Sequence, residues 1–534
     1  MNSITPAQLL ALQAGSAEWA LFDIREAGEA DQGHIFGASF LPRRLIEARI
    51  ADLVGNPDTT IVITDEGGAR AGRAAASLER LGYRDVRVLA GGTAAWVAAG
   101  QRLTSGSNVP SKLFGEEVYE HEHVPQLPVR TLKDWQEGNV PHMVCDIRTP
   151  DEYVVARIPG AHGAFGVDLA LVAGDLRART MPIVVHCAGR TRSIIACQTL
   201  RALGVSEVYA LENGTMGWQV AGYELERGTP RGELQATASS VSDGETRTRT
   251  LALAAGASEA SAEQVEAWLA ERAAGRSNTY FIDVRQLDAH VAGHIAGAIA
   301  LPGGLAIQRT DEFAPVRAAR VVLIDDGTAR AFLTAYWLCK AGRPHVAVMR
   351  GGQNGWKASG RTIESGRERK RPAGMDDARR AVNAITPAAL AALHKAQVVD
   401  VGTSRDFARA RVPGAVWIPY GSLEERIAAV TREAGVPLVL TCPNGSLSLF
   451  AAGNLQREGC VDVCVLEGGA SAWVKTGHAI DKGWPSTLPP ANDLVVPPYH
   501  ANLEAMARYL EWEEKLTAER RAGGGTQTRA ARQA

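Results

Sequence analysis

The sequence predicts an α/β protein made of four tandem domains, each a small parallel β-sheet flanked by helices on both faces. The chain has 534 residues, which exceeds what a single hydrophobic core usually organises. Short apolar runs alternate with helical patterns at short intervals, and this alternation is typical of parallel sheets covered by helices. A set of sequence landmarks also recurs four times, which indicates a repeated structural unit.

The four copies share landmarks in a fixed order. Each has an aspartate at the end of an apolar strand, then a turn containing Gly-Ala, then a strand that ends in a loop, and finally a glycine followed by a tryptophan. The strand aspartates are Asp23, Asp146, Asp283 and Asp400, and the tryptophans are Trp96, Trp218, Trp356 and Trp473. The step from loop start to tryptophan is the same throughout: 65 to 96, 187 to 218, 325 to 356, and 442 to 473. The copies should therefore share one fold.

Polar linkers set the predicted boundaries. The predicted domains span residues 1–103, 127–228, 258–364 and 383–484, and residues 485–534 form a C-terminal segment. The longest polar stretch runs from Arg227 to about Gly256, so we expect two tandem pairs, copies one and two and copies three and four, joined by a more mobile connector. In the C-terminal segment, Leu503 to Arg520 has helical periodicity and the tail from Gly523 should be disordered.

Composition excludes several classes of protein. A formal net charge of −2 gives no support for binding to nucleic acid or to a membrane surface, and no apolar run is long enough to span a bilayer. The N-terminus leads directly into a helical pattern from Ala7 to Leu12 and lacks the features of a signal peptide. Seven cysteines, an odd number without paired spacing, indicate reduced thiols in the cytoplasm. Cys460 and Cys464 alternate as in a strand, so we expect core thiols, no metal and no cofactor.

The candidate active site is the loop that follows the apolar strand at Ile183. The strand ends in Cys187, and a helical pattern begins at Ser193. Successive N–H groups in such a loop form an anion-binding concavity, and two arginines add positive charge. The thiol should therefore have a lowered pKa and react with an anionic substrate. The predicted catalytic residue is Cys187, and the predicted substrate-binding residues are Ala188, Gly189, Arg190, Thr191 and Arg192.

The corresponding loops of the other copies differ in chemistry. Copies one and three begin with Asp65 and Asp325, which offer no thiol nucleophile, and neighbouring acidic residues should repel anions. Copy four retains a possible second thiol, Cys442, but Leu447 replaces the loop arginine. Gly402 replaces the strand arginine and Pro443 lacks an N–H donor, so we expect this loop to bind and react with anions only weakly.

The remaining landmarks are predicted to be structural. Asp146 and Arg148 should form a buried pair that ties the strand to neighbouring turns, since the same pair recurs in copies without a cysteine. The tryptophans should belong to the core or cover the sheet edge. His186 precedes Cys187 on the strand, so its side chain should point to the opposite face and pack there.

Taken together, the Asp-x-Arg strand, the Gly-His-Ile-x-Gly-Ala turn, the Cys-x-x-x-x-Arg loop and the Gly-Gly-x-x-x-Trp end resemble rhodanese sulfurtransferase domains. The resemblance implies a central five-stranded parallel sheet and a cysteine that carries a sulfane sulfur as a persulfide. It also implies an inactive leading domain paired with an active trailing one, with the site near their interface. Copies one and two fit that arrangement.

The expected reaction transfers a sulfane sulfur from thiosulfate or a low-molecular persulfide to a thiophilic acceptor, cyanide or a thiol. Cys187 would attack the outer sulfur while Arg192 holds the anion and Arg190 steers anions from the rim. Three alternatives remain. A phosphatase would need one more loop residue, a 3-mercaptopyruvate sulfurtransferase usually has a less basic loop, and a non-catalytic scaffold could bind partners or sense sulfur or redox state.

Overall fold

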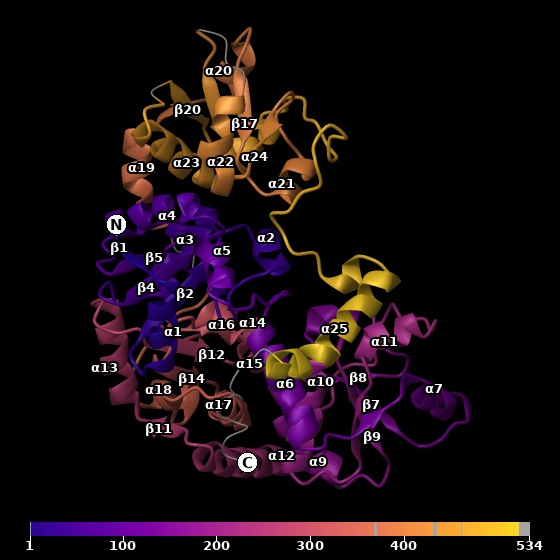
Figure 1. Cartoon of the computed structure of the whole chain (residues 1–534). Coiled ribbons are helices and arrows are strands. Elements are labelled where there is room, and N and C mark those ends of the chain that lie inside the picture. Colours follow the sequence, from indigo (N-terminus) through magenta and orange to yellow (C-terminus); the bar gives the residue numbers. More distant parts are fainter. Residues whose placement is uncertain (1, 368–370, 431–434, 461, 523–534) are drawn as a thin grey trace. The chain divides into compact units, whose positions relative to one another are not determined.

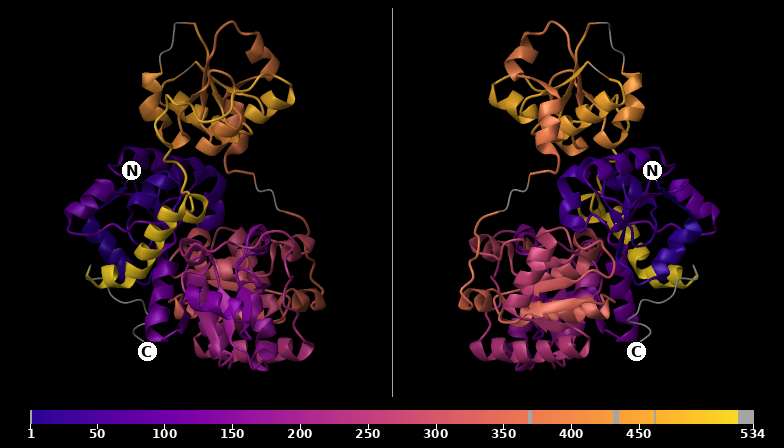
Figure 2. Two further views of the ribbon diagram at one scale, coloured as in Figure 1. Left: turned by 90° about the vertical axis from the view of Figure 1, so that its right-hand side faces the viewer. Right: turned by 90° about the vertical axis from the view of Figure 1, so that its left-hand side faces the viewer.

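The computed structural model describes residues 2–367, 371–430, 435–460 and 462–522. Over these residues the chain forms four five-stranded sheets in which all strand pairs are parallel, and helices flank each sheet (Figures 1 and 2). The strand order is the same in each, and in the first sheet it reads β1-β5-β4-β2-β3. The predicted fold class is confirmed, including the five-stranded sheet that the resemblance implied.

Copies one and two have matching elements. In copy one the strands are β1 (Asn2–Ile4), β2 (Trp19–Asp23), β3 (Ser39–Phe40), β4 (Thr60–Thr64) and β5 (Val86–Leu89), and the α-helices are α1 (Pro6–Ala14), α2 (Ala27–Gln32), α3 (Ile46–Leu53), α4 (Ala69–Arg80) and α5 (Gly92–Ala98). In copy two the strands are β6 (Gln126–Leu127), β7 (Met143–Asp146), β8 (His162–Gly163), β9 (Ile183–His186) and β10 (Val208–Leu211), and the α-helices are α6 (Val109–His121), α7 (Val129–Glu137), α8 (Pro150–Val155), α9 (Leu169–Arg177), α10 (Thr191–Ala202) and α11 (Gly214–Val220).

Copies three and four repeat this order. In copy three the strands are β11 (Ser258–Ala260), β12 (Tyr280–Asp283), β13 (Ile299–Ala300), β14 (Val321–Ile324) and β15 (Val346–Met349), and the α-helices are α13 (Ala262–Ala273), α14 (Leu287–Ala292), α15 (Gly303–Gln308), α16 (Thr310–Phe313), α17 (Ala329–Lys340) and α18 (Gly352–Ala358). In copy four the strands are β16 (Asn383–Ile385), β17 (Gln397–Asp400), β18 (Val416–Trp417), β19 (Leu438–Thr441) and β20 (Val463–Leu466), and the α-helices are α19 (Met375–Ala381), α20 (Pro387–Ala392), α21 (Ser404–Arg409), α22 (Leu423–Arg426), α23 (Ser446–Arg457) and α24 (Gly469–Lys475).

The N-terminal residues contain a strand that the sequence analysis missed. β1 pairs with β5 before Thr5 caps α1, whose first turn forms a capping box with Gln8. Three residues are too few to show the alternation that identifies a strand, and the partner of β1 lies more than eighty residues away. The predicted helix from Ala7 to Leu12 lies within α1.

The repeated side chains form the predicted scaffold. The aspartates of β2, β7 and β12 each bind the arginine two residues later in a buried ion pair, with N–O distances of 2.7, 2.7 and 2.6 Å for Arg25, Arg148 and Arg285. The four tryptophans are buried, and each indole N–H donates to the carbonyl six residues later, at 2.7–3.2 Å. The predictions of a buried pair and of core tryptophans are therefore confirmed.

The predicted pairing of the copies is wrong. The chain divides into a first unit of Met1–Gly15, Trp19–Ser107 and Arg369–Val495, and a second unit of Ser16–Glu18, Asn108–Glu368 and Val496–Ala534. The first unit therefore joins copies one and four, and the second joins copies two and three. Linker polarity misled the prediction, because it shows where the chain is exposed and not which faces pack together.

Buried polar contacts join copies one and four within the first unit. Arg43 forms an ion pair with Glu424 at 2.5 Å, and both side chains are almost fully buried. The hydroxyl of Tyr420 donates to Glu47 at 3.3 Å and accepts from the Asn454 amide at 2.6 Å. Since an unpaired charge is costly to bury, these groups make the contact selective for the matching face.

The predicted mobile connector contains a helix, α12 (Ala238–Ala254), which packs between α9 and α17 in the second unit (Figure 1). Ser240 donates to the Leu171 carbonyl at 2.6 Å. A Cβ at Gly244 would lie 2.1 Å from the Ala170 carbonyl oxygen, so glycine allows a close approach to α9. The polar composition therefore reflects a helix with one buried edge, and the expectation of mobility was wrong.

A second helix, α25 (Leu503–Ala522), also belongs to the second unit. It extends the predicted span of Leu503 to Arg520 by two residues. The tail from Gly523, expected to be disordered, lies outside the described residues. None of the helices described is both long and apolar enough to cross a membrane.

Candidate functional site

Cys187 lies directly after β9, at the carboxyl end of the sheet in copy two, and is 2% exposed. The start of α11 holds its loop, because Thr215 N–H donates to the Cys187 carbonyl and Met216 N–H to the Ala188 carbonyl, both at 2.9 Å. Gly214 has φ +53°, and a Cβ there would lie 2.3 Å from the Cys187 carbonyl oxygen. The glycine of the repeated motif thus lets the following helix approach the reactive loop.

The thiol is close to the start of α10. Its sulfur lies 3.5 Å from the Ser193 hydroxyl oxygen, and Ser193 in turn donates to the Arg190 carbonyl at 2.8 Å. His186 is fully buried, and burial lowers the pKa of its imidazole, so the ring is neutral near pH 7. His186 therefore packs in the core as predicted.

Arg192 is the loop cation that interacts electrostatically with the Cys187 thiol. Its guanidinium binds Glu152 of α8 through two hydrogen bonds of 2.8 and 2.9 Å. Burial lowers the pKa of Arg192, but Glu152 and the negative charge of Cys187 outweigh this effect and raise it. Burial raises the pKa of Glu152, yet Arg192 brings it down to about 2. The pair is therefore ionised near pH 7, with the cation held at the helix start.

Arg190 does not lie at the rim as expected. Its side chain is buried and makes two hydrogen bonds of 2.8 Å to Glu116 of α6. A third contact, 3.0 Å long, joins it to Glu514 of α25. The expected rim position of Arg190 was therefore wrong. The sequence could not show this, because both carboxylates belong to helices that it did not place beside this loop.

Helix α25 covers the Cys187 loop, which the sequence analysis missed. Figures 1 and 2 show this helix, in yellow, against α6, and it also contacts α11. Thr191 donates to Glu513 at 2.6 Å, and Met506 and Leu510 form a buried cluster with Met216. The buried spacing of Met506, Leu510, Glu513 and Thr517 along the helix could have predicted one packed face, but not its partner.

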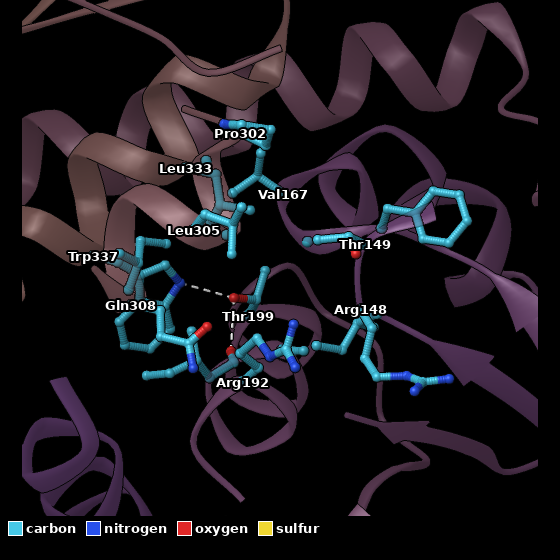
Figure 3. Close-up of a pocket in the computed structure, with 18 of the residues that line it drawn as sticks. Arg148, Thr149, Val167, Arg192, Thr199, Pro302, Leu305, Gln308, Leu333 and Trp337 are labelled. Atoms are coloured by element: carbon cyan, nitrogen blue, oxygen red, sulfur yellow. Dashed lines mark hydrogen bonds between the residues drawn. The ribbon is translucent and has the colours of Figure 1, made fainter. Parts of the chain in front are cut away.

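A cavity of about 60 Å³ lies between copies two and three, and Arg192 is one of the residues that line it (Figure 3). Its wall is mostly apolar, with Val167, Leu305 and Leu333 on one side and Arg148 and Arg192 on the other. Trp337 of α17 donates to the Thr199 hydroxyl at 2.8 Å at its edge. Cys187 is not among the residues that line it.

The loops of copies one and three are filled by their own aspartates. Asp325 accepts N–H bonds from Gly327 at 2.8 Å and Ala331 at 3.0 Å, and burial raises its pKa to about 6. Asp65 accepts the same kind of bonds from Gly68 and Ala71. Each carboxylate thus uses N–H donors that would otherwise be available to a bound anion.

Copy four contains an intermediate arrangement. The Cys442 sulfur accepts from Ser448 N–H at 3.5 Å, and burial raises the pKa of this thiol. Asp400 lacks the arginine partner of its counterparts and accepts only the Gly402 N–H, at 2.8 Å, among the hydrogen bonds of the described residues. Burial raises its pKa to about 7. A Cβ at Gly402 would lie 2.9 Å from Pro443, so the two replacements fit each other.

Comparison with known proteins agrees with this architecture. The chain matches the description "Rhodanese-like domain" over residues 5–99, 129–221, 261–359 and 386–476. A crystal structure of thiosulfate sulfurtransferase from Pseudomonas aeruginosa is 33% identical, covers 98% of both chains, and superposes with a TM-score of 0.88.

Two curated relatives match part of the chain. A Pseudomonas aeruginosa protein named thiosulfate sulfurtransferase is 26% identical over 249 residues, covering 39% of this chain and 91% of that protein. An Azotobacter vinelandii protein of the same name is 27% identical over 237 residues, covering 39% of this chain and 86% of that protein. With four matched segments that span most of its length, the chain belongs to the rhodanese family as four tandem rhodanese-like domains.

Proposed function

We propose that this protein is a sulfurtransferase that carries a sulfane sulfur as a persulfide on Cys187. The observation that supports it most is the position of this cysteine at the end of β9, with Arg192 at the start of α10. Cysteine and a loop arginine occur together at these positions in copy two alone. The likeness to proteins named thiosulfate sulfurtransferase supports thiosulfate as a donor.

The proposed reaction has two displacements. The Cys187 thiolate attacks the outer sulfur of thiosulfate, the sulfur–sulfur bond of the donor breaks, and sulfite leaves with the bonding electron pair. The product is a persulfide anion on Cys187, whose charge Arg192 and the loop N–H groups stabilise. Cyanide or a thiolate then attacks the outer sulfur and regenerates the Cys187 thiolate. A low-molecular persulfide could replace thiosulfate, with a thiolate leaving instead of sulfite.

The other three loops are proposed not to be principal transfer sites. Asp65 and Asp325 have no thiol and occupy their own loop donors. Cys442 lacks a loop arginine, and burial raises the pKa of its thiol, so little thiolate should form near pH 7. All seven cysteines are free, which supports a reducing compartment such as the cytoplasm.

The first prediction compares Cys187→Ser with Cys442→Ser in the full chain. Transfer from thiosulfate to cyanide should fall at least about a thousandfold in Cys187→Ser, because no nucleophile remains. Cys442→Ser should retain most activity and serves as the matched control. Thiocyanate formation measures turnover, and intact mass after incubation with thiosulfate measures the added sulfur.

Two results would contradict the proposal. Full activity in Cys187→Ser would exclude this residue as the sulfur carrier. A sulfur adduct on Cys187 without transfer to cyanide or a thiol would instead support a sensing scaffold.

A further inference from the structure

The side chains of the Cys187 loop contact more carboxylates than the loop has cations. The loop contributes two cations, Arg190 and Arg192. Four carboxylates contact loop side chains: Glu116 and Glu514 on Arg190, Glu152 on Arg192, and Glu513 on Thr191. Two of the four come from α25. Among the groups that these contacts connect, carboxylates therefore outnumber the loop's guanidiniums by four to two.

Of the two α25 carboxylates at the loop, Glu513 is the more buried, with an exposed fraction of 2%. One oxygen accepts the Thr191 hydroxyl, whereas the other has no hydrogen-bond partner among the described residues. That second oxygen lies 3.4 Å from the position that a Cβ on Gly189 would occupy. The second oxygen of Glu513 therefore lies against the loop that would bind a substrate anion.

Charged groups on α25 and in the Cys187 loop lie close enough to affect one another. Tyr509 of α25 is half-buried, and desolvation raises the pKa of its phenol, as do its charge and hydrogen-bond interactions with Glu513 and the charge of Cys187. Arg192 acts in the opposite direction on the same phenol. These effects are felt only at short range or through a poorly screened interior, so charge on α25 bears on whatever binds beside Cys187.

We propose that Glu513 and Glu514 are specificity-determining residues that disfavour dianionic sulfur donors and favour donors with less negative charge. This inference rests on the proposed sulfur transfer through Cys187. With α25 in place, a second negative charge on the donor meets two carboxylates at the loop. Low-molecular persulfides and organic thiosulfonates, which carry less charge on the sulfur group, meet less repulsion.

The test is a charge-only double substitution, Glu513→Gln with Glu514→Gln. Glutamine has nearly the same shape, and its carbonyl oxygen can still accept from Thr191 or Arg190. The two donors are thiosulfate, a dianion, and benzenethiosulfonate, a monoanion, each with cyanide as acceptor. The ratio of kcat/KM for thiosulfate to that for benzenethiosulfonate should rise by about tenfold in the variant, and by less at high salt.

The matched control is Glu511→Gln on the same helix, where the carboxylate is exposed and paired with Lys515. It removes one charge from α25 away from the loop and should leave the ratio unchanged. An unchanged or lower ratio in the double variant would overturn the specificity role while leaving sulfur transfer intact. If neither donor adds sulfur to wild-type Cys187 by intact mass, the proposed function itself fails, and the specificity role with it.

Discussion

At the scale of single residues, the first position of the loop has a different charge environment in different copies. Cys187 has a cation at the helix start, Cys442 has none in its loop, and Asp325 replaces the thiol with a carboxylate that binds the loop N–H groups itself. The sequence could predict which copies lost the nucleophile, because that depends on residue type alone. It could not predict that Arg190 forms an ion pair with Glu514, because the two residues are 324 positions apart in the chain.

Asp400 leads to a second prediction, on the pH dependence of stability. Burial raises its pKa from 3.8 to about 7 in the folded protein, so the folded state holds the proton more tightly than the unfolded state. Its stabilising contribution is complete below about pH 4 and is lost as pH rises to about 7. Asp400→Asn should therefore raise Tm at pH 8, by several degrees, and change it little at pH 4.

Asp283 provides the matched control. Burial raises the pKa of its carboxyl, but Arg285 and His290 outweigh burial, and the net shift is downward. Asp283→Asn should therefore lower Tm at pH 8, the opposite sign. Thermal unfolding of the full chain between pH 4 and pH 8 measures both, and a destabilised Asp400→Asn at pH 8 would contradict the assignment.

At the scale of elements, α12 and α25 are the helices whose roles sequence reasoning could not assign. Periodicity indicated a helix at Leu503 to Arg520, and the structure has one there. The same reasoning read the α12 region as linker, since its buried edge consists of small or polar residues such as Ser240, Gly244 and Thr248. Small residues let helices pack closely but do not create a helical spacing of large apolar residues. The pattern that normally identifies a buried helix face was therefore absent from the α12 region.

The third prediction concerns Gly244 in α12. In an isolated helix, glycine to alanine stabilises by about 1 kcal/mol. Here the new Cβ would lie 2.1 Å from the Ala170 carbonyl oxygen of α9, so Gly244→Ala should destabilise the second unit by about 1–3 kcal/mol. The expected change in the free energy of unfolding is therefore opposite in sign to the change in an isolated helix, and this difference would show the contact with α9.

Thr246→Ala is the control, since Thr246 is exposed on α12 and its hydroxyl donates to the Ser242 carbonyl of the same helix. It should change stability little. Denaturant unfolding followed by circular dichroism measures both variants, and stabilisation by Gly244→Ala would show that α12 is not held against α9.

At the scale of the whole molecule, the repeat could be predicted but the assembly of its copies could not. Equal spacing of the loop and the tryptophan established four similar sheets. Which copies pack together depends on pairs such as Trp337 with Thr199 and Arg43 with Glu424, and the sequence separations of these pairs are 138 and 381 residues. No local pattern carries that information.

The fourth prediction tests the pairing of copies two and three. Trp337 is almost fully buried and donates to Thr199 of α10, so Trp337→Ala should destabilise the second unit by about 3–5 kcal/mol. Hydrogen exchange should increase in α10 and α17 and stay unchanged in β4 and β19 of the first unit. Equal increases in all four of these elements would contradict the division into two units.

The nested pairing also has a consequence for biosynthesis. Arg43 leaves the ribosome 381 residues before Glu424, its buried ion-pair partner. At about 5–20 residues per second, that interval lasts roughly 20–75 s, during which copies two and three are completed. Until copy four is made, we expect the charged face of copy one to stay hydrated, because burying its unpaired charges would be costly. The same charged groups would thus limit aggregation of copy one during synthesis and, in the folded protein, bind copy four.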